Sequence, residues 1–219
     1  MAKRISMISG VIAAVAAAGV FLHGGAQSTE VPDYSGKVPA AAGEQIAVLA
    51  GGCFWGVDAV FKHVKGVSKV VSGYSGGDKA TANYAVVSNG GSGHAEAVQI
   101  TYDPAKISYA QLLKVFFSVA HDPTEVNRQG PDVGTQYRSA IFYTSEEQKQ
   151  VAQTYVEQLN KAKVFRAPIA SQIVPLKEFF PAEAYHQNYL ALHPNESYIM
   201  YHDMPKLENL KKMFASIYQ

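Results

Sequence analysis

The sequence predicts an α+β domain: a two-layer split βαβ (ferredoxin-like) sheet with helices on one face and an irregular C-terminal region wrapped around it. Two observations lead to this fold class. Segments in which apolar residues alternate, typical of strands, are interspersed with segments in which they recur at helical spacing. The first six predicted segments follow the order strand, helix, strand, strand, helix, strand. This is the order of the split βαβ arrangement.

Chain length and net charge indicate a single domain and argue against a nucleic-acid-binding protein. The chain has 219 residues and a formal net charge of +1. Its length suits one domain with one sizeable core, and its charge predicts no basic surface for a nucleic-acid partner. The sequence contains no internal repeat, and we expect a monomer.

Residues 1–26 have the pattern of a secretory signal peptide. Lys3 and Arg4 precede an uncharged stretch, 5–22, that is rich in Ala and Val, and small residues follow up to Ala26. We expect export to the periplasm, with cleavage near Ala26. A membrane anchor is the alternative, although the apolar stretch is marginal against the roughly 20 residues that a membrane span needs.

The folded domain is expected to follow a linker and to begin with a strand, a turn and a helix. Residues 27–44 lack apolar periodicity and predict the linker, so the domain spans 45–219. The apolar run 45–50 predicts a buried strand, and residues 67–71 predict a second strand after Gly66. The helix between them is indicated by apolar residues at helical spacing: Val57, Val60, Phe61 and Val64.

Alternation from 95 to 102 predicts a third strand, and the remaining elements follow along the chain. The next is a helix that begins with a capping box at Ser108 and Gln111 and runs to Ala120. A strand near 137–143, a helix capped by Ser145, a strand near 169–174 and a helix near 182–192 then follow. A last amphipathic helix is indicated by apolar residues at helical spacing: Leu207, Leu210, Phe214 and Ile217.

The single cysteine, Cys53, lies where the first strand is predicted to turn into the first helix, and only Phe54 separates it from the single tryptophan, Trp55. Unpaired N–H groups and the positive dipole end of a helix lower the pKa of a thiol, which makes it a nucleophile. A small buried apolar residue is the alternative for a lone cysteine. An unpaired cysteine in an exported chain instead indicates a reactive thiol or a disulfide partner in another molecule. One sulfur is too few for a thiolate metal site, and no metal is expected.

Glu96 is the best candidate for an acid near this thiol. The two-residue period places its carboxyl group on the apolar face with Val98 and Ile100. Burial there would raise the pKa of the carboxyl group and make it a proton donor at neutral pH. The alternative is a strand that starts after Glu96 and leaves the carboxylate solvated.

A long polar loop from His121 to Gln136 is a further candidate, because such loops between strong elements are often functional. Asp132 lies within this loop and Tyr137 directly follows it. Each also has a simple structural role available, a turn for Asp132 and packing for Tyr137.

Five stretches of the sequence together resemble one known family. They are Gly51-Gly52-Cys53-Phe54-Trp55-Gly56, Gly73-Tyr74-Ser75-Gly76-Gly77, Gly93-His94-Ala95-Glu96, residues 127–139, and Glu183-Ala184-Tyr185-His186-Gln187-Asn188-Tyr189. In order and spacing they closely resemble the A-type peptide methionine sulfoxide reductases, and the resemblance covers roughly residues 45–200.

The resemblance implies a repair enzyme that reduces the S epimer of methionine sulfoxide, free or in oxidised proteins, to methionine. It implies that Cys53 is the nucleophile and becomes a sulfenic acid, and that Glu96 is the proton donor. It also implies that the phenols of Tyr84 and Tyr137 hold the sulfoxide oxygen, and that Phe54 and Trp55 form the wall of a pocket for the substrate's methyl group. For Asp132 it implies a carboxylate that is hydrogen-bonded within the site and takes part in recycling the enzyme.

The sequence departs from the family's pattern at two places. Many members carry resolving cysteines near the C-terminus, whereas residues 201–219 contain none. We therefore expect no bound cofactor and an external reductant, which is a thioredoxin-like protein, a glutaredoxin-like protein or a small thiol. Thr81-Ala82-Asn83 stands where the family often has Asn-Pro before the tyrosine, which predicts a looser loop at Tyr84.

Two alternatives from other functional classes stay open on the sequence. The first is a cysteine acyl-transferase or hydrolase, in which His94, His121 or His186 acts as the base. The second is a binding module whose aromatic pocket recognises thioether or methylated ligands. A thiol with a lowered pKa favours an enzyme, because a binding module has no need of one.

Overall fold

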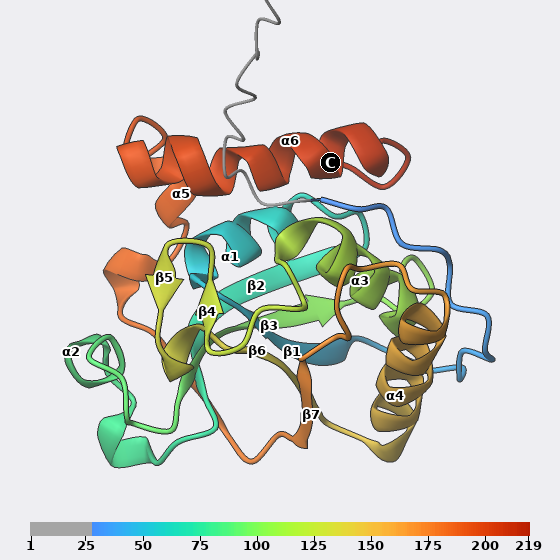
Figure 1. Cartoon of the computed structure of the whole chain (residues 1–219), viewed down its shortest axis with the longest axis horizontal. Helices are drawn as coiled ribbons and strands as arrows, with labels where there is room; N and C mark the ends of the chain where they lie inside the picture. Colours follow the sequence, from blue (N-terminus) through green and yellow to red (C-terminus); the bar gives the residue numbers. More distant parts are fainter. Residues whose placement is uncertain (1–27) are drawn as a thin grey trace, which may run out of the picture.

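A mixed sheet of six strands forms the centre of the structure, a computed structural model that describes residues 28–219 (Figure 1). Its strands are β1 (Gln45–Gly51), β2 (Val67–Ser75), β3 (Ala95–Tyr102), β6 (Ser139–Tyr143), β7 (Gln172–Pro175) and β8 (Phe179–Pro181). They are arranged in the order β7-β6-β1-β3-β2-β8, and only the β6–β7 pair is parallel. The structure is therefore α+β, as predicted. The signal-peptide prediction for residues 1–26 lies outside the described residues.

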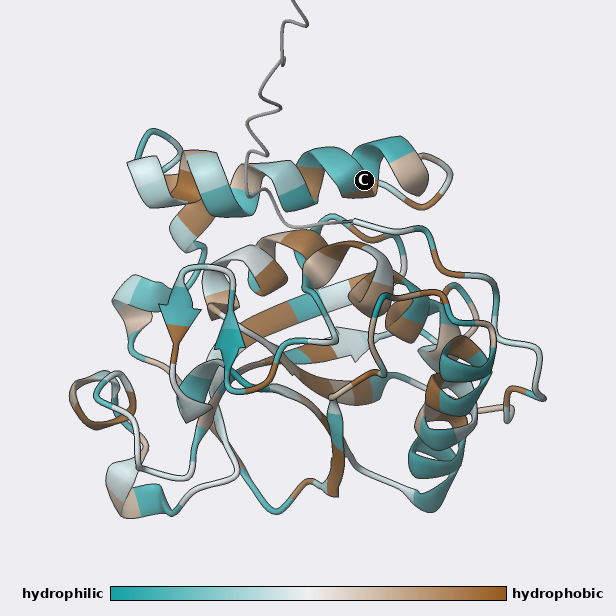
Figure 2. Ribbon diagram, in the orientation of Figure 1, coloured by the Kyte–Doolittle hydropathy of each residue, from teal (hydrophilic) through white to brown (hydrophobic). Residues whose placement is uncertain are grey.

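The two faces of this sheet are covered differently. On one face, Leu49, Val98 and Ile141 belong to a large apolar core that includes residues of four helices. These helices are α1 (Phe54–Lys62), α3 (Tyr109–Val115), α4 (Glu146–Lys161) and α6 (Met204–Met213). The other face presents small side chains such as Ala97 and is covered by irregular chain around Leu176. In Figure 1, α6 crosses α1 on the side away from the sheet, and Figure 2 shows hydrophobic residues gathered on α1 and the sheet and hydrophilic ones on the outer side of α4.

Local sequence signals account for where the central helices begin. Ser108 and Gln111 form the predicted capping box at α3: Ser108 Oγ accepts the Gln111 N–H at 3.2 Å, and Gln111 Oε1 accepts the Ser108 N–H at 2.8 Å. Ser145 caps α4 in the same way through the Gln148 N–H, at 3.2 Å. Such caps each contribute about 1 kcal/mol. After α3 the chain continues as a buried π-helical turn, η2 (Phe116–Ala120), so the helix reaches Ala120 as predicted but changes type.

The predicted helix over 182–192 is wrong. The segment contains only a 3-10 turn, η4 (Ala184–His186), and a single-turn helix, α5 (Tyr189–Leu192). Between them Gln187 is extended and binds the main chain of Ser72 through both ends of its amide, at 3.0 and 2.9 Å. Asn188 then adopts a left-handed conformation with φ of 58°. A contact with a residue far away in the sequence thus interrupts the helical spacing.

Other boundaries differ from the predictions at the ends of elements. β2 extends to Ser75, and its last residues pair with β3 on one side and on the other with β8, a short strand that was not predicted. The strand expected near 137–143 starts at Ser139, because residues before it form the 3-10 turn η3 (Thr135–Tyr137). The last helix starts earlier than its apolar residues suggest, after a π-helical turn, η5 (Ile199–Asp203), and with a proline in its first turn. A two-stranded ribbon, β4 (Arg128–Gln129) and β5 (Asp132–Val133), lies within the long polar loop.

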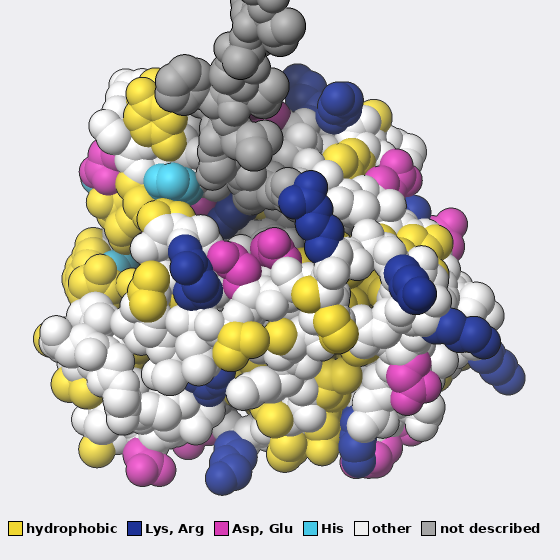
Figure 3. Space-filling model, in the orientation of Figure 1, with side chains coloured by type: hydrophobic (Ala, Val, Ile, Leu, Met, Phe, Trp, Pro, Cys, Tyr) yellow, Lys and Arg dark blue, Asp and Glu magenta, His cyan; other side chains and the backbone are white. Residues whose placement is uncertain are grey.

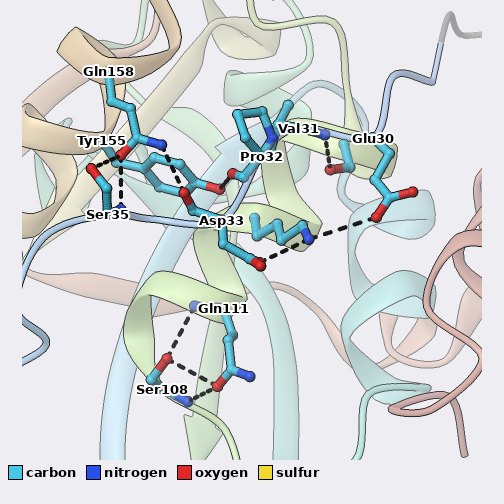
Figure 4. Close-up of polar contacts among 11 residues, drawn as sticks. Glu30, Val31, Pro32, Asp33, Ser35, Ser108, Gln111, Tyr155 and Gln158 are labelled. Atoms are coloured by element: carbon cyan, nitrogen blue, oxygen red, sulfur yellow. Dashed lines mark hydrogen bonds and ion pairs between the residues drawn. The ribbon is translucent and has the colours of Figure 1, made fainter.

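The predicted linker contains no helix or strand from Ser28 to Glu44, yet part of it is tightly held. Val31 is 1% exposed and its N–H donates to Ser118 Oγ, while the Tyr155 hydroxyl donates to the Pro32 carbonyl at 2.6 Å (Figure 4). Lys114 on α3 pairs with both Asp33 and Glu30. Contacts with the domain therefore begin well before β1. Among residues 28–219, no helix is long and apolar enough to cross a membrane.

Candidate active site

A cavity of about 190 Å³ opens at the N-terminal end of α1. The residues that line it are Cys53, Phe54, Trp55, Tyr84, Glu96, Asp132, Tyr137 and Tyr198. The structure thus brings together all seven candidate residues from the sequence and adds Tyr198. Three larger grooves, of about 490 to 570 Å³, lie elsewhere on the described surface and contain neither Cys53 nor Glu96.

The turn between β1 and α1 places Cys53 at the cavity. Gly52 has φ of +88°, a left-handed conformation that favours glycine, and a Cβ atom there would lie 2.5 Å from the Gln129 side chain. Cys53 then occupies the N-cap position of α1 and is 7% exposed. The predicted position at the junction of strand and helix is confirmed.

The predicted lowering of the Cys53 pKa is wrong. Burial raises the pKa of the thiol well above its usual range, and the negative charges of Glu96 and Asp203 raise it further. The backbone N–H of Trp55 and the ammonium group of Lys206 act in the opposite direction, but they do not offset the loss of solvent. The sulfur of the resting protein is therefore a thiol, and its ionisation requires a proton acceptor in the cavity.

Glu96 is buried on the helix-covered face of β3, as predicted. The residue is 2% exposed, and its Oε2 atom accepts the backbone N–H of Phe54 at 3.1 Å. Burial raises the pKa of this carboxyl group to about 8, with a further contribution from Asp132 and Asp203, while the Phe54 N–H lowers it. At neutral pH the group is therefore mostly protonated and able to donate.

Three phenol groups line the same cavity. Tyr84 starts the short helix α2 (Tyr84–Val87), Tyr137 ends η3, and Tyr198 directly precedes η5. Burial raises the pKa of all three phenols, and the nearby Glu96 charge adds to this for Tyr84 and Tyr137. All three therefore keep their protons near neutral pH and can donate hydrogen bonds.

Hydrogen bonds hold the loop before Tyr84, although Thr81-Ala82-Asn83 replaces the family's usual Asn-Pro pair. Asn83 caps α2 by accepting the Val86 N–H at 3.2 Å. The backbone N–H of Tyr84 also donates to Glu183 Oε1 at 2.9 Å, which ties α2 to the C-terminal region. These two contacts hold Tyr84 in place without an Asn-Pro pair.

Asp132 joins the β4–β5 ribbon to the C-terminal region. Its Oδ2 atom accepts a short hydrogen bond from the Tyr198 hydroxyl group. Tyr198 was not predicted, because the chain contains thirteen tyrosines and no periodic signal distinguishes this one. Only the return of the C-terminal chain over α1 places it at the cavity.

Aromatic contacts fix the apolar wall of the cavity. The Trp55 ring stacks on Tyr189 with centroids 3.7 Å apart and an interplanar angle of 5°. Its Nε1–H donates to His186 Nδ1 at 3.1 Å, and the His186 ring in turn packs on Phe54 with centroids 5.0 Å apart. Trp55 is thus held on two sides, although the sequence indicated neither Tyr189 nor His186 as its partner.

None of the three histidines considered as a base for a hydrolase lines the cavity. Each has a hydrogen-bond partner: the Gly77 N–H for His94, the Phe116 carbonyl and Ser139 hydroxyl for His121, and the indole N–H of the cavity residue Trp55 for His186. Burial also lowers the pKa of His121 to about 3. This geometry does not favour the hydrolase alternative.

Comparison with known proteins identifies one family. The profile of the family described as peptide methionine sulfoxide reductase matches residues 45–217. Peptide methionine sulfoxide reductase MsrA 2 of Mesorhizobium japonicum is 59% identical over 179 residues, covering 82% of this chain and 92% of the relative. Peptide methionine sulfoxide reductase MsrA of Thermus thermophilus is 51% identical over 174 residues, covering 80% and 97%.

Solved structures agree with this result. The reduced form of Mxr1 from Saccharomyces cerevisiae aligns with a TM-score of 0.63 and 34% identity, covering 72% of this chain and 90% of the yeast chain. Methionine sulfoxide reductase A of Corynebacterium diphtheriae aligns with a TM-score of 0.60 and 32% identity, covering 72% and 78%.

Proposed function

Because this chain belongs to the peptide methionine sulfoxide reductase family, we propose that its cavity binds a methionine sulfoxide side chain and that Cys53 accepts the oxygen atom. The chain reduces methionine sulfoxide to methionine. The observation that carries the assignment of roles is the meeting of one thiol, one protonated carboxyl group and three phenols in one cavity. The S epimer is the proposed substrate, since each sulfoxide epimer has its own enzyme class.

In the proposed step, a sulfur–oxygen bond of the substrate breaks and one forms on Cys53. Glu96 donates its proton to the sulfoxide oxygen, and its carboxylate then accepts the thiol proton, so the acid is restored. The Cys53 sulfur attacks the substrate sulfur and then takes the hydroxyl group, and methionine leaves. The substrate sulfur gains two electrons and the Cys53 sulfur loses two, which leaves a sulfenic acid.

The phenols are proposed to stabilise the charge that develops on the oxygen. Tyr84 and Tyr137 remain protonated, and hydrogen-bond donors directed at a developing negative charge are worth most in a site without solvent. Phe54 and Trp55 are proposed to contact the methyl group of the substrate. The stacking of Trp55 on Tyr189 supports this role, because it fixes the position of the indole ring.

Exposed apolar side chains near the cavity support a protein-bound substrate in addition to the free amino acid. Many of the large apolar side chains exposed on the described surface lie within three positions of a cavity or wall residue: Val86, Val133, Tyr185, Leu192, Met200 and Tyr201. Exposed apolar side chains beside a binding site often contact other molecules. In Figure 3, hydrophobic side chains gather on the side of the molecule where α5 and β5 lie in Figure 1.

An external thiol is proposed to recycle the enzyme. Cys53 is the only cysteine of the 219 residues, so the chain contains no second thiol to form a disulfide with it. A reductant thiol attacks the sulfenic sulfur and releases water, and a second thiol resolves the mixed disulfide. Thioredoxin-like proteins, glutaredoxin-like proteins and small thiols all have this chemistry. Asp132 is proposed to assist this recycling, and its hydrogen bond with Tyr198 supports the role because it connects the carboxylate to the other polar groups of the cavity.

We also propose a ferredoxin-like core and a monomeric, exported protein. The antiparallel order β6-β1-β3-β2 in the middle of the sheet supports the first proposal. The charged and apolar pattern of residues 1–26 supports export to the periplasm, with a membrane anchor as the second possibility.

The decisive experiment is a single-turnover assay without reductant. Purified protein is mixed separately with each epimer of methionine sulfoxide, and methionine release and Cys53 oxidation are measured. We expect about one equivalent of methionine from the S epimer and none from the R epimer, because one thiol accepts one oxygen. Release by a Cys53→Ser variant would contradict the assignment, and an acyl-enzyme formed with an activated ester would support the hydrolase alternative.

A further inference from the structure

A buried ion pair lies next to the cavity, and the proposed reaction does not use it. Asp203, the last residue of η5, is 0% exposed, and Lys206, in the first turn of α6, is 5% exposed. The Lys206 Nζ atom lies 3.1 Å from Asp203 Oδ1. Among residues 28–219, Lys206 is the only buried lysine or arginine. Burial of a charge is unfavourable unless it is paired, so this arrangement calls for a reason.

The pair lies directly against the first turn of α1. A Cβ atom at Gly56 would lie 2.1 Å from Asp203 Oδ1 and 2.8 Å from Lys206 Nζ. Only a glycine therefore lets the pair approach this turn, three residues after Cys53. The second carboxylate oxygen, Asp203 Oδ2, is buried and has no hydrogen-bond partner among the described residues.

The charges around Cys53 come from several elements. Glu96 on β3 and Asp203 on η5 are acidic groups that disfavour a thiolate, and Asp132 on β5 lies in the same cavity. The phenols of Tyr84, Tyr137, Tyr189 and Tyr198 are neutral near pH 7, as is the His186 imidazole that accepts from Trp55. Among these groups, Lys206 is the cation whose charge favours ionisation of the Cys53 thiol.

We propose that Lys206 supplies the positive charge that supports the Cys53 thiolate during attack, and that Asp203 is the positioning residue that holds the ammonium group against α1. This inference rests on the proposed role of Cys53 as nucleophile. Asp203 fixes the cation through one oxygen while its own charge opposes ionisation of the thiol. The two members of the pair therefore affect Cys53 with opposite sign.

This opposition gives a test that separates electrostatics from simple packing. Lys206→Met and Asp203→Asn each remove the same ion pair with little change in side-chain size. The readout is the rate of Cys53 alkylation by iodoacetamide over a range of pH, which is proportional to the fraction of thiolate. We expect alkylation on the order of tenfold slower in Lys206→Met and on the order of tenfold faster in Asp203→Asn, the effect of about one pKa unit.

Further variants keep the test informative if a single variant does not fold. The double variant Asp203→Asn/Lys206→Met leaves no unpaired charge, and its alkylation rate should lie between those of the two single variants. Lys206→Arg should restore most of the wild-type rate. Lys62→Met is the matched control, because Lys62 pairs with the buried Asp58 on α1 at 2.7 Å and is not among the charges that act on Cys53; its rate should not change.

The direction of the change in alkylation rate decides whether the ion pair acts on Cys53 or only packs against α1. A shift of both single variants in the same direction, or an unchanged rate in Lys206→Met, would overturn the proposal and leave the pair a packing role. In the single-turnover assay, Lys206→Met should also slow methionine release at neutral pH. Alkylation does not depend on methionine sulfoxide, so failure of the proposed reductase chemistry would be seen separately, as absence of methionine release in the wild-type protein.

Discussion

Replacing Glu96 with glutamine is expected to stabilise the fold and, at the same time, to slow the reaction. The carboxyl group has a pKa of about 8 in the folded protein, whereas an unperturbed glutamate has a pKa of about 4.3. Below pH 4 the carboxyl group is neutral in both the folded and the unfolded chain, so its ionisation does not lower the free energy of unfolding. As the pH rises toward 8, the unfolded chain loses the proton and the folded chain retains it, so stability is lost.

The size of this effect follows from the two pKa values. Each unit of difference corresponds to about 1.36 kcal/mol, so the free energy of unfolding of the wild type is lower than at low pH by about 1 kcal/mol at pH 5 and by about 5 kcal/mol at pH 8. Glutamine is neutral at every pH, and its side-chain oxygen can still accept the Phe54 N–H. The variant should therefore exceed the wild type in free energy of unfolding by these amounts.

Two measurements check this prediction. Urea unfolding at pH 5 and pH 8 gives the stability difference, and single-turnover methionine release gives the activity, which should fall by on the order of 10²-fold without the acid. Glu157→Gln, on the exposed side of α4, is a matched control that should change neither quantity. Equal stability of Glu96→Gln and wild type at both pH values would show that the carboxyl group is ionised in the fold, and unchanged methionine release would remove it from the mechanism.

Three further changes test the cavity, the turn and the N-terminal segment. Tyr137→Phe should lower single-turnover methionine release roughly 10- to 10²-fold with little change in stability, because it removes a donor to the oxygen; an unchanged rate would assign Tyr137 to packing alone. Gly52→Ala should lower the free energy of unfolding by about 2 kcal/mol, as measured with urea, because the φ of +88° is strained for alanine and the new Cβ meets Gln129; a neutral result would mean that the turn can relax. Val31→Ala should cost about 1 to 2 kcal/mol in the same assay because it deletes a buried side chain, and a cost near zero would mean that the segment before β1 is not part of the core.

Much of the fold was predictable because its signals are local. The alternation in β3 places Glu96 on the same face as Val98 and Ile100, and this is the face that the helices cover. The capping residues Ser108 and Ser145 mark the starts of α3 and α4 as expected. Such patterns depend on neighbours within a few positions, so a single sequence is enough to detect them.

The residues of the cavity were predictable in part. A distinctive motif identified Cys53, and the resemblance to a family extended the prediction to residues such as Tyr84 and Asp132, which all line the cavity. Tyr198 and the pair of Asp203 and Lys206 were missed. They reach the site only because the C-terminal segment returns over α1, and no local period reports that return.

The tertiary structure also decided the charge state of the nucleophile and the end of a predicted helix. From the chain alone, a cysteine at the start of α1 should ionise easily, since the helix terminus is a local effect. Burial by chain segments distant in sequence removes water from the sulfur and places two carboxyl groups near it, so the pKa rises instead. Likewise, Gln187 leaves helical geometry to bind Ser72, 115 positions away. Periodicity and motifs are properties of neighbouring residues, whereas desolvation and long-range hydrogen bonds exist only once the chain has folded.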